Sequence, residues 1–84
     1  MGGTDKGKSD RQVEFGDRIR TQRQRLDLSQ EALAHLAGIN RTYVASLETG
    51  QRNPSLDLMA RLALALKMDL GELVAGLQKK KGRS

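Results

Sequence analysis

Apolar residues recur at intervals of three and four along almost the whole chain, and no segment alternates apolar and polar residues as a half-buried strand would. This periodicity predicts helices, each with one apolar stripe to bury against the others. The 84 residues suffice for one such domain and are too few for two. The chain contains no cysteine, so packing or a partner subunit must hold it together. We therefore predict the all-α fold class.

Capping residues and glycines divide the periodic region into five predicted helices. A serine, asparagine or aspartate precedes each helix, where its side-chain oxygen can accept from free backbone amides. In the first helix, Val13, Phe15 and Ile19 are predicted to face the core. Gly71 and Gly76 weaken the fifth helix, which we expect packing to hold. The predicted helices run from Ser9 to about Leu26, Ser29 to Gly38, Asn40 to Gly50, Ser55 to about Leu66 and Asp69 to Leu77.

The two ends of the chain differ in composition from the predicted domain, residues 9–77. Residues 1–8 contain three glycines and no large apolar residue after Met1, so we expect a disordered tail. Residues 78–84 carry four basic residues and no acidic one, which predicts a basic C-terminal tail. Most of the net charge of +5 lies in that tail. An argument for nucleic-acid binding must therefore rest on where individual charges lie.

The segment 30–49 has residues suited to two short helices that cross over a tight turn. Ala34 supplies the small side chain needed at the crossing, and Gly38 permits the turn. Val44 and Leu47 are spaced to anchor the second helix on the first. The opposite face of the second helix has no acidic residue, so it can enter a major groove without repelling phosphates. That face consists of Arg41, Thr42, Ala45, Ser46 and Thr49.

This part of the chain resembles the helix-turn-helix domains of phage Cro and repressor proteins, the XRE-like class. The resemblance covers about residues 15–77 and rests on the strings LSQEALAHLAGINRTYVASLETGQRNPSL and LALALKMDLGELV. Within that class, NRTYV followed by LETGQRNPSL is most similar to the controller proteins of restriction-modification systems, which are small dimers. The resemblance implies a compact five-helix Cro/repressor-like domain that binds double-stranded DNA.

The resemblance also implies roles for individual residues. Gln30 would lie over the DNA backbone, and Arg23 would pair with Glu48 in a partly buried, structural salt bridge. A guanidinium at a base edge can bind guanine through two hydrogen bonds. The residues implied at base edges are Arg41, Thr42 and Ser46. The further residues implied at phosphates are Asn40, Tyr43, Arg52 and Asn53.

Extra apolar residues on the last two helices predict a homodimer. Leu56 and Leu64 add apolar surface beyond what one core stripe requires. A two-fold contact between these helices would place two recognition helices about one DNA turn, roughly 34 to 36 Å, apart. The predicted interface residues are Leu56, Met59, Leu64, Leu70, Val74 and Leu77.

These observations predict a sequence-specific transcriptional regulator that binds a palindromic operator as a homodimer. It would occupy a promoter and either block RNA polymerase or contact it from an adjacent site. Two alternatives stay open at this point. One is an antitoxin-type protein that also binds a toxin, and the other is an interaction module that keeps the fold but binds no DNA.

Catalytic, metal and membrane roles find little support in the sequence. His35 is the only histidine, and there is no cysteine to complete a metal or catalytic site with it. The longest apolar stretch, residues 58–70, is interrupted by three charged residues, and the N-terminus has no apolar signal region. We expect no cofactor, no enzymatic activity, no membrane contact and a cytoplasmic, nucleoid-associated location.

Overall fold

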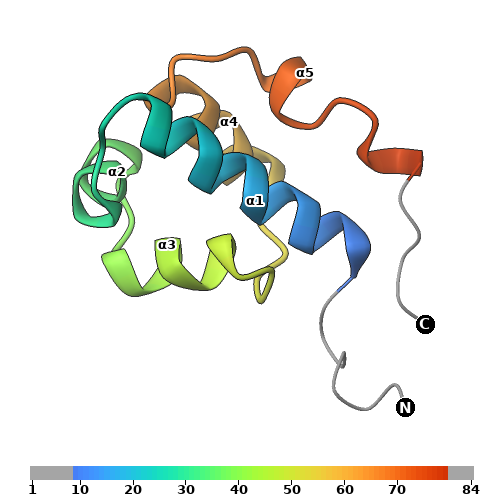
Figure 1. The fold of residues 1–84 in the computed structure, drawn as a ribbon, viewed down its shortest axis with the longest axis horizontal. Helices are drawn as coiled ribbons and strands as arrows, with labels where there is room; N and C mark the ends of the chain where they lie inside the picture. The colour runs from blue at the N-terminus through green and yellow to red at the C-terminus, as the bar shows by residue number, and fades with distance from the viewer. Residues whose placement is uncertain (1–8, 80–84) are drawn as a thin grey trace.

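The computed structural model describes residues 9–79, which form five α-helices and a short 3₁₀ helix (Figure 1). The helices are α1 (Asp10–Arg25), α2 (Gln30–Ala37), α3 (Arg41–Glu48), α4 (Leu56–Ala65), α5 (Leu70–Leu73) and the 3₁₀ helix η2 (Leu77–Lys79). Within this range there is no strand, which confirms the all-α fold class. The predicted disordered tail, residues 1–8, and residues 80–84 of the predicted basic tail lie outside the described residues.

The first four helices begin at the capping residues that the sequence predicts. The hydroxyls of Ser9, Ser29 and Ser55 accept from the backbone N–H three residues further on, at 2.9 to 3.1 Å. Asn40 caps α3 in the same way through its Oδ1, at 2.7 Å. Gly38 follows α2 with φ 74°, a left-handed conformation that costs glycine little and turns the chain sharply into α3.

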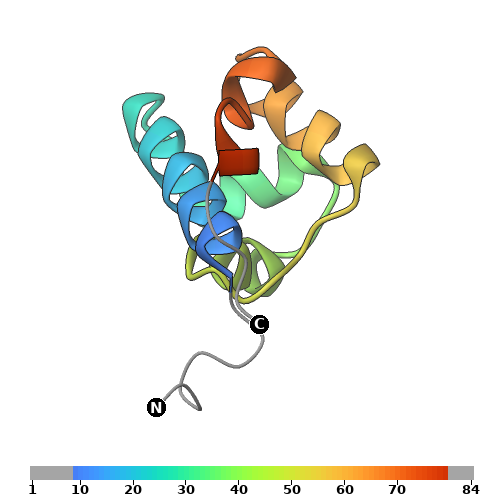
Figure 2. The same cartoon turned by 90° about the vertical axis from the view of Figure 1, so that its right-hand side faces the viewer.

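One core lies between the helices and is built mainly from leucine and alanine side chains. α1 packs on α3, and α2 packs on both α3 and α4. In the view of Figure 2, the C-terminal segment lies between α1 and α4 and covers the core from that side. Val13, predicted to face the core, is instead 48% exposed. The core residues are Phe15, Ile19, Leu33, Ala34, Ala37, Val44, Leu47, Leu58, Leu62, Ala63, Leu66, Leu73 and Leu77.

The close approach of α1 to the end of α3 depends on Gly16. A Cβ atom built on Gly16 would lie 2.1 Å from the carbonyl oxygen of Leu47, far inside van der Waals contact. Any larger residue here would have to push the two helices apart. No role for Gly16 follows from the sequence alone, because a glycine inside a helix is otherwise only unfavourable.

The predicted fifth helix is too long. α5 has four residues and is followed by a turn, with Gly76 at φ 76°, before η2 begins. Two glycines in eight residues explain the early end, because glycine lowers helix stability and readily takes the left-handed conformation. Leu73 and Leu77 nevertheless both reach the core, with 0% and 9% of their surface exposed.

Side chains from α1 hold this C-terminal segment by its carbonyl groups. Arg18 Nη1 donates to Leu73 O and Arg11 Nε to Leu77 O, both at 3.0 Å. Gln22 Nε2 donates to the carbonyl oxygen of Leu66, the C-cap of α4, also at 3.0 Å. These donors satisfy carbonyls that short helices leave without intrahelical partners.

Candidate nucleic-acid interface

α3 is anchored on one side and open on the other. Val44 and Leu47 are buried, with 0% and 1% exposure, and Ala34 on α2 is 3% exposed where the helices cross. The opposite side of α3 carries Arg41 and Thr42, both exposed. The predicted helix-turn-helix geometry is present, and it leaves the predicted recognition face available.

The polar groups on this face differ in what they can offer a base edge. Arg41 is the first residue of α3 and presents only donors. Ser46 Oγ donates to the Thr42 carbonyl at 3.1 Å, so its remaining lone pairs can only accept, as from an amino group of cytosine or adenine. Ser46 is partly buried and Thr42 exposed, which places Thr42 further toward solvent.

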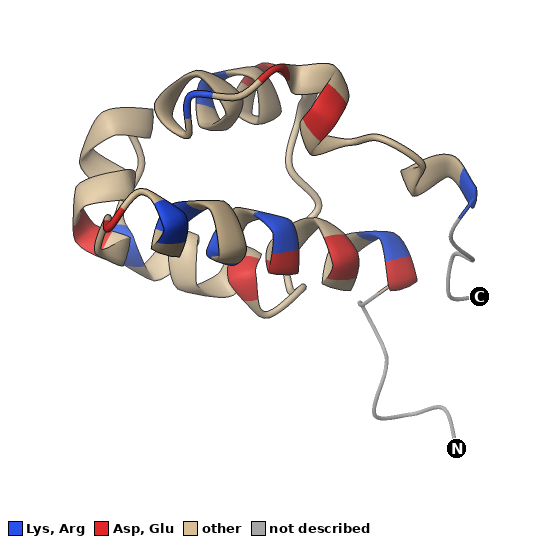
Figure 3. Cartoon of the chain, turned by 45° about the horizontal axis from the view of Figure 1, so that its top comes forward, with Lys and Arg blue, Asp and Glu red and all other residues tan. Residues whose placement is uncertain are grey.

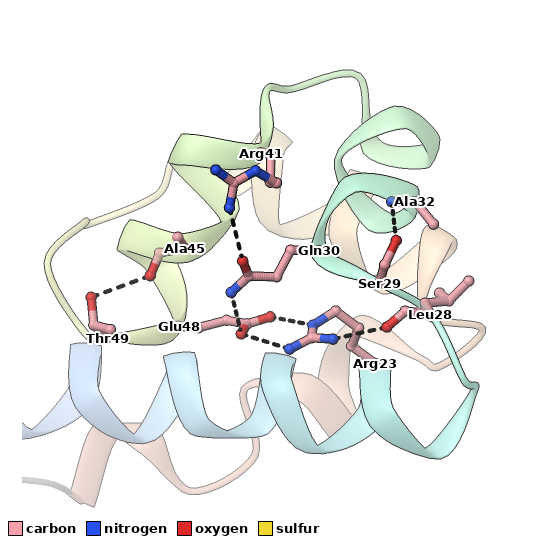
Figure 4. A network of polar contacts seen from close by, with 9 residues as sticks. All are labelled: Arg23, Leu28, Ser29, Gln30, Ala32, Arg41, Ala45, Glu48 and Thr49. Atoms are coloured by element: carbon pink, nitrogen blue, oxygen red, sulfur yellow. Dashed lines mark hydrogen bonds and ion pairs between the residues drawn. The ribbon is translucent and has the colours of Figure 1, made fainter.

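Beneath this face, Arg23 and Glu48 form the predicted ion pair (Figure 4). Arg23 Nε and Nη2 donate to the two carboxylate oxygens of Glu48 at 2.6 and 3.0 Å. The side chains are 12% and 3% exposed, so the pair is more deeply buried than the sequence implied. Hydrogen bonding to Glu48 raises the pKa of Arg23 above its ordinary value, against the opposing effect of burial. The only acidic residue of α3 is thus neutralised behind the predicted recognition face.

Gln30 lies between this ion pair and Arg41 (Figure 4). Its Nε2 donates to Glu48 Oε1 at 3.1 Å, and its Oε1 accepts from Arg41 Nη1 at 3.5 Å. Four side chains therefore form one continuous polar chain from the interior to the exposed end of α3. The sequence and its resemblance gave Gln30 only a place over the DNA backbone, because its contact with Glu48 joins residues 18 apart.

Arg52, in the loop after α3, lies over the ring of Tyr43 with its guanidinium carbon 5.0 Å from the ring centre. Such cation–π stacking restrains a long side chain that would otherwise be free. Asn40 and Asn53, also predicted at phosphates, have other neighbours in the structure. Asn40 uses its Oδ1 to cap α3, so its amide N–H groups are the donors that it can offer a phosphate. Asn53 lines a groove beside the start of α4.

A groove of about 380 Å³ runs between the start of α1, the start of α4 and the C-terminal segment. Five of the six residues predicted at a dimer interface line it: Leu56, Met59, Leu70, Val74 and Leu77. Leu56 is 68% exposed, whereas Leu77 is only 9% exposed and belongs mostly to the core. Leu64 does not line the groove and is 81% exposed on α4. The structure thus separates Leu64 from the other five.

Charge alone does not single out a binding surface on residues 9–79. Acidic and basic side chains are interspersed along α1 (Figure 3), where Arg18 pairs with Glu14 and Arg20 with Asp17.

Among residues 9–79, no group of three or more His, Cys, Asp or Glu side chains is placed to hold a metal ion. No helix in the described part of the chain has the length and apolarity needed to cross a membrane.

Comparison with known proteins identifies the domain. The sequence matches the helix-turn-helix family over residues 19–73. The chain belongs to the helix-turn-helix family. Control protein C.MunI of Mycoplasma sp is 35% identical to it over 72 residues, which cover 84% of this chain and 97% of that protein. Control protein C.SmaI of Serratia marcescens is 37% identical over 70 residues, which cover 81% and 83%.

Solved structures of this helix-turn-helix family confirm the predicted Cro/repressor-like fold. The restriction-modification controller protein C.AhdI from Aeromonas hydrophila is 49% identical, with a TM-score of 0.71 over 73% of this chain and 92% of that one. The P22 c2 repressor, solved in complex with a synthetic operator, is 27% identical, with a TM-score of 0.69 over 74% and 94%. The similarity to controller proteins that the sequence suggested is therefore confirmed as well.

Proposed function

We propose that this chain is a transcriptional regulator of the restriction-modification controller type, which binds operator DNA by placing α3 in the major groove. The observation that carries the proposal is the acid-free outer face of α3. That face is anchored by buried Val44 and Leu47, and the only carboxylate of the helix is paired inside the domain. A helix presented in this way fits a major groove and meets no charge repulsion from phosphates. We propose no catalytic role.

Within this face, Arg41 is the proposed specificity residue. It lies at the N-terminal end of α3, the part of a recognition helix that contacts base edges. A bidentate contact from its guanidinium to guanine would contribute about 1 to 3 kcal/mol of discrimination. Thr42 and Ser46 add a hydroxyl each, and Ser46 offers acceptors alone while its proton is held by the helix.

Arg52, in the loop after α3, and Asn40, the N-cap of α3, are proposed phosphate contacts. Stacking on Tyr43 holds the Arg52 guanidinium beside the helix before DNA arrives, which reduces the entropy lost on binding. The amide N–H groups of Asn40, the N-cap of α3, remain available as donors. Asn53 and Tyr43 complete the set proposed to fix register rather than sequence.

We propose a homodimer in which a second copy covers the groove between α1, α4 and the C-terminal segment. The groove exposes apolar surface from Leu56, Met59, Leu70 and Val74, which a partner would remove from water. A two-fold contact is self-complementary, so it presents two α3 helices to a palindromic operator. Leu64 lies outside this groove and is not part of the proposed contact.

The regulator would act in the cytoplasm by occupying promoter DNA. Its effect depends on the position of the operator: it represses where it blocks RNA polymerase and activates where it contacts polymerase from an adjacent site. An antitoxin-type role would add a protein partner to the same domain. A protein that co-purifies with the chain and stays bound to an Arg41→Ala variant would favour that second candidate.

Selection of bound sequences from a random duplex pool tests the proposed function. The experiment compares the unmodified chain, Arg41→Ala and the control Arg20→Ala at about 150 mM salt, near physiological ionic strength. Arg20 is a matched control because its guanidinium is exposed on α1 and pairs with Asp17. We expect a palindromic motif that loses information at one symmetric pair of positions in Arg41→Ala alone. Binding without an enriched motif, lost as salt rises, would contradict the proposal.

A further inference from the structure

The ion pair of Arg23 and Glu48 dictates which way the amide of Gln30 points. A carboxylate only accepts hydrogen bonds, so the group that Gln30 turns toward Glu48 must be its NH₂. The 3.1 Å contact from Gln30 Nε2 to Glu48 Oε1 shows this arrangement. The opposite orientation would place the amide oxygen against a carboxylate oxygen in a site where Glu48 is 3% exposed and unfavourable electrostatics are poorly screened.

With its NH₂ facing inward, Gln30 necessarily presents Oε1 to the outside. That oxygen faces Arg41 Nη1 at 3.5 Å (Figure 4). The contact is long and exposed, so it restrains the guanidinium without holding it away from DNA. The charge buried beneath α3 thus determines that the group beside Arg41 is an acceptor, and an acceptor suits a side chain that has only donors.

We propose that Glu48, acting through Gln30, positions Arg41 for base recognition. Gln30 and Glu48 are then positioning residues for specificity, and the buried ion pair has a second role besides stability. Restricting the Arg41 rotamers in the free protein lowers the entropy cost of forming a bidentate contact with a base. The benefit applies only where Arg41 finds its preferred base, so it raises discrimination at that base pair. This inference rests on the proposed function of Arg41.

The test measures the affinity of Gln30→Met for the duplex selected from the random pool and for duplexes changed at each base pair in turn. Methionine keeps the length of the side chain and removes both polar groups. Gln24→Met is the matched control, because Gln24 is exposed near the end of α1. Arg41→Ala and the Gln30→Met/Arg41→Ala double variant complete the cycle. Melting temperatures of all variants are measured in parallel.

We expect Arg41→Ala to reduce discrimination at one symmetric position by about 5- to 150-fold. Gln30→Met should reduce discrimination at that same position by about 2- to 5-fold, the effect of one modest hydrogen bond. The double variant should discriminate between the duplexes as well as Arg41→Ala alone does. Gln24→Met should leave the discrimination at every base pair unchanged. A Glu48→Gln variant should weaken discrimination at the same position, because a neutral amide at residue 48 no longer dictates the orientation of Gln30.

Three results would overturn the inference in different ways. If Gln30→Met weakens binding to all duplexes equally, Gln30 is a phosphate contact and does not position Arg41, although the proposed function stands. If Arg41→Ala changes no preference, then no base contact exists for Gln30 to position, and the proposed function of Arg41 fails too. A lower melting temperature with unchanged discrimination would likewise reduce Gln30 to a structural residue.

Discussion

Replacing Glu48 with alanine should destabilise the domain far more than the loss of a solvent-exposed ion pair would. The substitution removes the acceptor of three hydrogen bonds, two from Arg23 and one from Gln30. Arg23 keeps only the carbonyl of Leu28, at 2.8 Å, and is too buried at 12% exposure to regain full hydration. Stranding one member of a buried pair costs about 3 to 5 kcal/mol. The remaining Leu28 contact places the expected loss near 3 kcal/mol.

That loss is a large fraction of the total stability of a small domain, about 0.05 to 0.15 kcal/mol per residue. Thermal and urea unfolding followed by circular dichroism would measure it, and a 3 kcal/mol loss should lower the Tm by more than about 12 °C. Glu14→Ala is the matched control, because its pairing with Arg18 is partly exposed at 34% and 26%; it should cost less than about 1 kcal/mol.

The double variant Arg23→Met/Glu48→Leu separates two quantities: the free-energy cost of an unpaired buried charge and the net contribution of the ion pair to stability. Apolar side chains of similar size leave no unpaired group, so the double variant should recover a substantial part of the loss. A Glu48→Ala variant that loses less than about 1 kcal/mol would refute the reasoning. It would mean that Arg23 regains solvent easily and that the pair is effectively a surface contact.

Three further predictions follow from the fold and the proposed interface. Gly16→Ala should lower the free energy of unfolding by about 1 to 3 kcal/mol or more in urea titrations, since its Cβ would lie 2.1 Å from Leu47 O. Leu56→Asp should shift sedimentation from dimer to monomer, whereas Leu64→Asp, outside the groove, should leave the dimer intact. Arg52→Ala should weaken binding to all duplexes similarly. It should also reduce the slope of the logarithm of the binding constant against the logarithm of salt concentration by about one.

The features that the sequence predicts correctly are those decided by local chemistry. A serine or asparagine before an apolar stripe caps a helix wherever it occurs, and Gly38 turns the chain because few other residues take that conformation easily. The anchoring positions Val44 and Leu47 follow from helical periodicity within one short segment. The outer face of α3 is the side opposite those positions, so which residues it exposes follows as well.

The features that escape prediction depend on distances between separate elements. Gly16 has a role only because α3 passes within contact distance of it. Arg18 reaches the carbonyl of Leu73 on a segment 55 residues away, a contact that no local pattern indicates. α5 ends early because two glycines outweigh the apolar spacing that continues to Leu77. Gln30 gains its role from Glu48, a partner that no short motif links to it.

NMR chemical-shift mapping with the selected duplex would test most directly whether α3 is the DNA-binding face. Amide signals of Arg41, Thr42 and Ser46, with those of Gln30 and Arg52, should shift strongly as the duplex is added, while exposed Leu64 on α4 stays unchanged. That result would place DNA on the outer face of α3. Shifts confined to the chain ends and to basic positions on α1, with α3 unaffected, would contradict the central claim.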